Sequence, residues 1–252
     1  MMNMMIRKAI LFSSLFFSTT VFAQTPEKNI RTAGQLWLAY LNQTRFSEKW
    51  GAWMDIHYRT TDNIADRPMT LLIRPAVTYF IKDNLRVNVG YAFAEHYPRK
   101  GLSTTRREHR PWQQIWWNQK YPGLALLQYL RLEQRFNQKV VSDRLQEGYN
   151  YTFRVRYSFS FSVPLNRKDI IANTPFAALS NEVFLNFGSS VTYNTFDQNR
   201  LFAGFGYQFT PHINAQLGYM YLYQQEASGH NYLSAHAIRV SVSQTLDLRK
   251  KD

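Results

Sequence analysis

The sequence contains no cysteine. This absence rules out a disulfide framework, a cysteine nucleophile and a thiolate metal site. Beyond residue 23, no apolar run approaches 18 residues, so the sequence predicts no transmembrane helix. No linker, low-complexity tract or charge block divides the remainder, which we interpret as one all-β domain over residues 24–252.

Residues 1–23 have the features of a secretory signal peptide. Arg7 and Lys8 provide the positive start, residues 9–22 carry no charge, and Ala23 ends a plausible cleavage site. The alternative is an uncleaved membrane anchor, but the uncharged run is shorter than the ~20 residues that a spanning helix needs. We therefore predict export and cleavage after Ala23.

Acidic residues are scarce, with 17 Asp and Glu against 30 Lys and Arg. Removal of Arg7 and Lys8 leaves 28 basic residues and a formal charge of 28 − 17 = +11. Such a balance favours an anionic neighbour, either lipopolysaccharide phosphates, an anionic solute or nucleic acid. The basic residues are scattered singly and no basic helix is visible, so we expect no nucleic-acid partner.

The clearest structural pattern lies in residues 149–163. Aromatic residues and valines occupy every odd position there, and polar residues occupy every even position. Successive side chains of a β-strand point to opposite faces, so this segment predicts a strand with one apolar and one polar wall. The apolar wall expected to face lipid consists of Tyr151, Phe153, Val155, Tyr157, Phe159 and Phe161.

Similar alternation continues through the chain. Expected strands cover residues 35–42, 50–60, 71–81, 85–94, 112–121, 124–136, 149–163, 180–188, 200–209, 213–223 and 235–246. These are eleven segments, whereas single-chain bacterial barrels have an even number of strands. We expect one strand to be missed or miscounted near the first strand or within 164–178, a region that also suits a short helix or an irregular turn. Twelve strands are favoured over ten.

Three observations favour a membrane barrel over a soluble one. Aromatic residues crowd the apolar wall toward strand ends, where interfacial girdles lie. Short turns alternate with longer polar loops, the short ones near Lys82, Tyr121 and Thr210 and the long ones near Tyr97, Asn137 and Ser189. Arginines recur on the polar wall, where a dry core would not accept them unpaired but a hydrated lumen would: Arg59, Arg74, Arg86, Arg131, Arg135, Arg154, Arg156 and Arg239.

We therefore predict an all-β fold, a transmembrane antiparallel up-and-down β-barrel of ten to twelve strands. The expected location is the outer membrane of a Gram-negative envelope, and the expected state is a monomer in contact with outer-membrane lipid and lipopolysaccharide. A soluble periplasmic β-barrel binding protein is an alternative.

The order of several short motifs resembles a family of outer-membrane barrels of unknown activity, domain-of-unknown-function family 2490 (DUF2490). The motifs are Trp37, residues 50–59, Lys82-Asp83-Asn84-Leu85 with Gly90-Tyr91, His109-Arg110, residues 131–135 and residues 182–188. This resemblance covers most of the mature chain and implies the barrel and the outer membrane, but no activity. Such barrels commonly end in an aromatic residue that the outer-membrane assembly machinery reads, whereas this chain ends in Asp252, so its insertion signal departs from the pattern.

The polar wall carries the main candidate site, a lumen charge network. Spacing by two residues puts each local set on one wall, where neighbouring strands allow charge-assisted hydrogen bonds. The set comprises Arg59, Arg74, Arg131, Glu133, Arg135, Arg154, Arg156, Glu182 and Arg239. Two interpretations stay open, an internal salt-bridge plug that closes the barrel and an arginine-lined constriction that favours anions.

Catalytic signals are weak. A lipid hydrolase needs a nucleophile, an activating histidine and an orienting group, and no histidine here lies in a His-x-Ser arrangement. Around one loop, His96, His109 and Ser103 could converge, so a lipid A deacylase or phospholipase type of enzyme is the alternative to a non-enzymatic pore or structural barrel. We assign no catalytic residue, no metal site and no cofactor; Gly204-x-Gly206 lies within an expected strand and is no dinucleotide motif.

A basic edge marks the loop expected over residues 97–109. Lys100, Arg106, Arg107 and Arg110 follow one another there. An outward-facing loop of this kind would contact lipopolysaccharide phosphates, while a solvated loop without a partner is the alternative.

Overall fold

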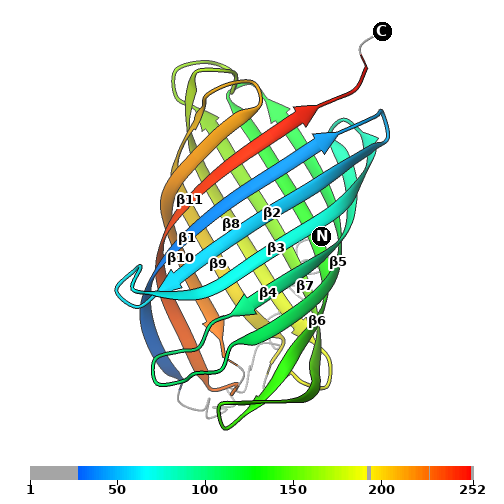
Figure 1. Cartoon of the computed structure of the whole chain (residues 1–252). Coiled ribbons are helices and arrows are strands. Elements are labelled where there is room, and N and C mark those ends of the chain that lie inside the picture. The colour runs from blue at the N-terminus through cyan, green and yellow to red at the C-terminus, as the bar shows by residue number, and fades with distance from the viewer. Residues whose placement is uncertain (1–27, 192–193, 227, 251–252) are drawn as a thin grey trace, which may run out of the picture.

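Eleven β-strands form one closed barrel in the computed structural model, which describes residues 28–191, 194–226 and 228–250 (Figure 1). The strands are β1 (Asn29–Arg45), β2 (Trp50–Thr61), β3 (Arg67–Lys82), β4 (Leu85–His96), β5 (Arg106–Tyr121), β6 (Leu124–Val141), β7 (Arg144–Pro164), β8 (Thr174–Phe187), β9 (Phe196–Gln208), β10 (Ile213–Gln225) and β11 (Asn231–Asp247). The predicted all-β up-and-down barrel is confirmed. The predicted signal peptide at residues 1–23 lies outside the described residues.

Consecutive strands pair antiparallel all around the barrel, and the closing pair is different. Strands β1 and β11 run parallel, in a register from Asn29 opposite Asn231 to Arg45 opposite Asp247 (Figure 1). The favoured count of twelve strands is therefore wrong, because a parallel seam closes an odd number of strands without a further one. Strand β1 also extends well beyond the expected residues 35–42.

Because the number of strands is odd, β1 begins at one mouth of the barrel and β11 ends at the other. We call the end where β11 finishes the C-terminal mouth; its connections are residues 46–49, 83–84, 122–123, 165–173 and 209–212. The end where β1 begins is the N-terminal mouth, and the loop over residues 97–105 lies there with the connections β2–β3, β6–β7, β8–β9 and β10–β11. In Figure 1 the C-terminal mouth is at the top.

Three expected loop boundaries change. The polar loop expected over 137–148 is instead a continuation of β6 and β7, joined by a two-residue turn at Ser142 and Asp143 with positive φ angles of 50° and 55°. The loop expected over 97–109 ends before Arg106, where β5 begins. Residues 164–178 contain no missed strand, because they are the end of β7, a loop and the start of β8.

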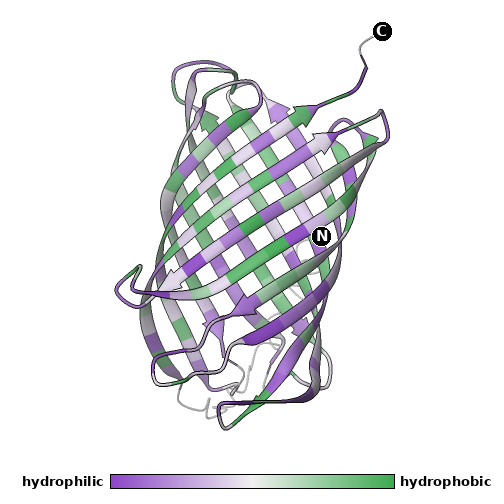
Figure 2. Cartoon of the chain, viewed as in Figure 1, coloured by the Kyte–Doolittle hydropathy of each residue, from purple (hydrophilic) through white to green (hydrophobic). Residues whose placement is uncertain are grey.

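Side-chain alternation sorts the two walls as a membrane barrel would. On β7, Tyr157 is 37% exposed on the outer surface, while its neighbours Arg156 and Ser158 are 4% and 5% exposed inside. Figure 2 shows this alternation of hydrophobic and hydrophilic positions along the strands. Exposed aromatic residues lie near both mouths, with Trp50, Tyr79, Tyr121 and Tyr207 at the C-terminal mouth and Tyr149, Tyr151 and Phe187 at the other.

Two apolar clusters fill part of the barrel interior. One centres on Trp37, Phe176 and Phe202, and Ile170 of the β7–β8 loop packs against it. The other contains Trp53, Leu72 and Trp112. Gly206 makes room for the first cluster, because a Cβ atom there would lie 2.2 Å from the Phe176 ring.

Candidate functional site

Glu133 is the centre of the interior charge network. The register of β6 with β7 places Glu133 opposite Arg154 and Arg131 opposite Arg156. Arg154 Nε donates to Glu133 Oε2 at 2.6 Å, and Arg156 Nη2 donates to Glu133 Oε1 at 3.0 Å. The carboxylate is fully buried, and Arg110 and Arg131 lie within 3.6 and 3.9 Å of it. One carboxylate thus compensates several guanidinium groups.

Glu108 organises a second part of the network nearer the N-terminal mouth. Arg110 and Arg135 both donate to Glu108 Oε1, from their Nε atoms at 2.9 and 2.6 Å. His96 Nε2 lies 3.0 Å from the other carboxylate oxygen. Because charged buried groups are stable only when they are paired and hydrogen-bonded, this carboxylate holds three strands in one register.

The remaining interior carboxylates also accept hydrogen bonds from arginines, and Asp197 shares Arg154 with Glu133. Asp55 accepts from Arg74 Nε at 2.7 Å, and Glu182 accepts from Arg200 Nη1 at 3.2 Å. Asp197 accepts from Arg154 Nη1 at 2.9 Å. The carboxylates of the interior are therefore occupied by arginines.

Several interior arginines that form no hydrogen bond with a carboxylate stack on aromatic rings instead. A guanidinium group above an aromatic face gains electrostatic and dispersion energy without a counterion. The Cζ atom of Arg59 lies 3.6 Å from the centre of the Trp37 ring, and that of Arg239 lies 4.6 Å from the Phe202 ring. The Cζ atom of Arg86 lies in the same way 3.7 Å from the centre of the Trp116 ring.

A cavity of about 1200 Å³ opens from the N-terminal mouth into this interior, and we call it the vestibule. Its inner end is lined by Trp37, Arg59, Arg156 and Arg200. Beyond these residues the interior holds the buried apolar clusters, with Phe176 only 3% exposed. The vestibule thus ends in a floor of arginines and tryptophan above a packed core.

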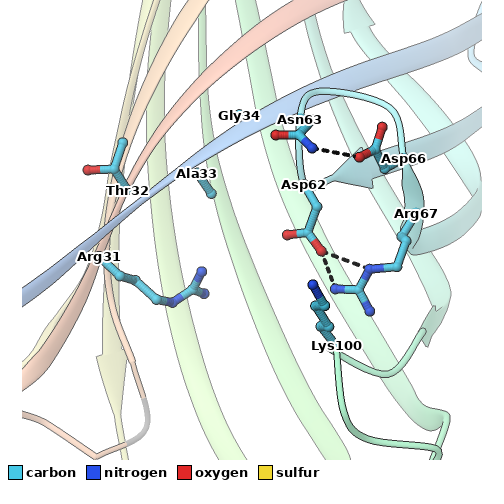
Figure 3. Close-up of a pocket in the computed structure, with 9 residues that line it drawn as sticks. All are labelled: Arg31, Thr32, Ala33, Gly34, Asp62, Asn63, Asp66, Arg67 and Lys100. Carbon is cyan, nitrogen blue, oxygen red and sulfur yellow. Dashed lines mark hydrogen bonds and ion pairs between the residues drawn. The ribbon is translucent and has the colours of Figure 1, made fainter.

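A smaller cavity of about 570 Å³ lies at the rim of the vestibule (Figure 3). Arg67 pairs there with Asp62 across the β2–β3 loop. Arg31 of β1 and Lys100 of the β4–β5 loop line both cavities, so the rim pocket is a side chamber of the vestibule entrance.

The structure places all of the predicted lumen residues on the inner wall. Arg131, Glu133, Arg154, Arg156 and Glu182 come together as one network, since Glu182 lies 3.9 Å from Arg156. The others have separate partners, with Arg135 on Glu108, Arg74 on Asp55, Arg59 on Trp37 and Arg239 on Phe202.

The predicted lipid-facing residues of β7 occupy the outer wall. Tyr151 and Tyr157 are exposed. Phe153, Val155, Phe159 and Phe161 are half-buried by their neighbours on the outer surface.

The predicted basic edge is divided between the two faces of β5. Lys100 lies in the loop and Arg107 points outward, its side chain 63% exposed. Arg106 lines the vestibule and Arg110 is buried against Glu108, so these two do not belong to an outer edge. The prediction was wrong because it placed these residues in a loop. Strand β5 begins at Arg106, and from there successive side chains point to opposite faces.

The structure does not bring the candidate catalytic residues together. His96 points inward, with Thr70 Oγ1 3.2 Å from its Nδ1 atom and Glu108 on its other side. His109 points outward and contacts Tyr91 and Tyr149. Ser103 donates instead to Asp143, at 2.9 Å. The two histidines and the serine therefore do not converge.

Several charged residues of the site were missed by the sequence prediction. They include the carboxylates Asp55, Glu108 and Asp197 and the arginine Arg200. Alternation contained the signal for two of them, because Asp55 shares the polar wall with Arg59, and Arg200 has the same parity as Gly204 and Gly206. Glu108 and Asp197 lay in segments taken as loops.

Two features are absent from the part of the chain that the structure describes. No group of three or more His, Asp or Glu side chains there has the arrangement to hold a metal ion. The same residues include no helix of the length and apolarity needed to cross a membrane.

A family model supplies the decisive comparison. The model of a protein family of unknown function, DUF2490, matches residues 34–233, which include most of the barrel and every residue of the interior network except Arg239. The chain belongs to this family. The sequence-based resemblance to DUF2490 is thus confirmed, and the description of DUF2490 supplies no activity.

The other comparisons add little to the DUF2490 assignment. No curated protein matches the chain. A crystal structure of the NanC porin, in a rhombohedral form, matches with 13% sequence identity and a TM-score of 0.49, over 84% of this chain and 99% of that one. At this level of similarity, no property of the porin is carried over to this DUF2490 chain.

Proposed function

We propose that the mature protein is a monomeric outer-membrane β-barrel with a non-enzymatic role, closed at mid-height by its interior charge network. One observation carries the proposal: apolar side chains cover the outer wall, while the carboxylate of Glu133 and its arginines lie buried inside. In a soluble barrel the outer wall would face water and the apolar side chains would lie inside. The opposite arrangement suits hydrocarbon outside and a polar interior.

Closure follows from how the interior is filled. Arg131 and Arg154 are each 3% exposed, although they point into the barrel. Separating one member of such a buried ion pair from its partner would leave an uncompensated charge, which is costly. The network is therefore rigid. A stack of guanidinium groups on aromatic rings, rather than a continuous column of water, therefore occupies the middle of the barrel.

A narrow pore for small solutes is the second candidate, and the vestibule favours it. This cavity extends from the N-terminal mouth to Arg156 and Arg200, so only the floor and the packed core beneath it would have to move. We infer further that Lys100 and Arg107 contact lipopolysaccharide phosphates at the rim, because both are on the surface of the N-terminal mouth.

Planar-bilayer recording tests closure. The purified protein should give no steps of conductance in symmetrical salt, because the packed core blocks the path below the vestibule. Stable unitary steps would contradict closure and support the pore. The same preparation should show no lipid A deacylation, and hydrolysis of lipid A would overturn the non-enzymatic role.

Fractionation tests the location. A barrel in the outer membrane is expected to sediment with that membrane and to migrate differently on gels before and after boiling. Recovery in the soluble periplasmic fraction would overturn the proposal and favour a soluble binding protein.

A further inference from the structure

Arg59 is a charged group of the vestibule floor without a counterion. It forms no ion pair with the described residues, and its buried Nε atom has no hydrogen-bond partner among them. Its guanidinium group lies flat on Trp37, and Arg200 lies 4.8 Å from the same ring. An unsatisfied buried donor on a cation is costly, so the floor is incomplete without an acceptor.

The charges around Arg59 make its lack of a counterion more unfavourable. Burial disfavours the charge of Arg59 most, and its charged neighbours Arg200, Arg74, Arg156 and Arg110 add to this because they are all positive. The nearby carboxylates cannot compensate it, because each of them accepts from another arginine. A positive field of this kind, in a cavity with low-dielectric walls, concentrates anions.

The vestibule also has the size and the surface of a binding site. Its volume of about 1200 Å³ is slightly larger than the roughly 300–1,000 Å³ of typical small-molecule pockets, so it has room for a small organic molecule. Arg59, Arg110, Arg156 and Arg200 line it together, and so does the flat ring of Trp37. Guanidinium groups form paired hydrogen bonds with the oxygens of a phosphate or a carboxylate.

We propose that the vestibule floor binds a small organic anion bearing a phosphate or carboxylate group, with Arg59 as its principal partner. The anion enters from the N-terminal mouth and neutralises the guanidinium group of Arg59. The site requires the barrel and the vestibule but not the membrane location, so its test in detergent is separate from fractionation and from conductance.

Titration calorimetry of the mature protein in zwitterionic micelles provides the test, with glucose 6-phosphate as the probe and glucose as its neutral counterpart. Wild-type protein should bind glucose 6-phosphate, more weakly as salt is raised, and should not bind glucose. R59Q should weaken binding by about tenfold to a hundredfold, because it removes charge-assisted hydrogen bonds.

R86Q is the matched control. Arg86 also stacks on a tryptophan and also has a buried Nε without a partner, but it does not line the vestibule. The R86Q variant should bind glucose 6-phosphate with the same affinity as the wild type. R59Q should also unfold at a temperature no lower than the wild type, because it removes a charge from among like charges.

Three results would overturn the site: unchanged affinity in R59Q, an equal loss in R86Q, or binding of glucose as strong as that of its phosphate. Lipid A in mixed micelles identifies the source of the anion. Competition with glucose 6-phosphate at Arg59 assigns the site to a lipid headgroup, and absence of competition assigns it to a free solute.

Discussion

Glu133 shows how a single residue controls the barrel interior. It is fully buried and forms ion pairs with Arg110, Arg131, Arg154 and Arg156 at distances from 2.5 to 3.9 Å. These arginines come from three strands, so one negative charge makes their close approach possible. An aromatic ring provides further stabilisation, since Arg154 and Arg156 also lie over Phe184.

Substitution of Glu133 by glutamine keeps the shape of the side chain and removes its charge. We expect E133Q to lower the free energy of unfolding by about 3–5 kcal/mol, because buried arginines then lack their counterion. Urea unfolding in micelles, followed by tryptophan fluorescence, measures this change.

Glu95 offers the control for E133Q. Its side chain is 26% exposed and lies 3.8 Å from Arg107, so E95Q should change stability by no more than about 0.5 kcal/mol. Equal unfolding midpoints for E133Q and wild type would contradict the central role of Glu133.

At the scale of elements, the β6–β7 hairpin is fastened to the β4–β5 loop. Asp143 at the hairpin tip accepts from the backbone N–H of Ser103 at 2.8 Å and of Thr104 at 3.0 Å. The Ser103 hydroxyl donates to the same carboxylate, and the Thr104 hydroxyl donates to the Asp143 carbonyl. This clasp holds two elements together at the vestibule entrance.

Loss of the Asp143 charge should release the loop. We expect D143N to accelerate hydrogen exchange at the Ser103 and Thr104 amides at neutral pH, because a neutral amide is a weaker acceptor. The control is E147Q, which removes an exposed charge from the same hairpin and should leave exchange in the loop unchanged. Identical exchange in D143N and wild type would show that the clasp does not order the loop.

The clasp should also depend on pH. The backbone N–H and the hydroxyl of Ser103, with the N–H of Thr104, hold the pKa of Asp143 below its ordinary value. A carboxyl group with a depressed folded pKa stabilises the structure above its unfolded pKa and loses this contribution as pH falls through the folded value. Exchange corrected for intrinsic rates should therefore stay slow at neutral pH and rise only in acid.

At the scale of the whole molecule, the outer wall distinguishes a membrane barrel from a soluble one. Leu201 lies near the middle of β9 and is 46% exposed. Phe209 is 51% exposed but lies just past the end of the same strand. In a bilayer around the barrel, the two positions would therefore lie at different depths.

An arginine at each position tests this difference. We expect L201R to lower stability in lipid by about 2–4 kcal/mol and F209R by at most about 1 kcal/mol, since the cost of a charge depends on depth. Folding into vesicles at several urea concentrations measures both. Equal and small effects would favour a soluble barrel, where either exposed site accepts an arginine.

Alternation accounts for most of what the sequence predicts. Period-two spacing is enough to separate Phe153 and Tyr157 from Arg154 and Arg156, because a strand has no other way to arrange them. Partners across strands were harder to predict. The pairing of Glu108 with Arg135 depends on the register of β5 with β6, which no local pattern contains.

The errors have a common physical origin in strand ends and closure. A polar hairpin that projects past the barrel has the composition of a loop, so the residues around Asp143 were taken for one. The even-number rule assumes an antiparallel closure. The pairing of β1 with β11 involves residues from opposite ends of the chain, and its direction is decided only when the whole barrel forms.

The parallel seam has a topological consequence. A chain that traverses a layer an odd number of times starts on one side and finishes on the other. If β11 ends toward the periplasm, Asn29 at the start of β1 lies on the side of the cell surface and Asp247 at the end of β11 lies on the periplasmic side. Reagents added from different compartments would then reach the first residue of β1 and the last residue of β11.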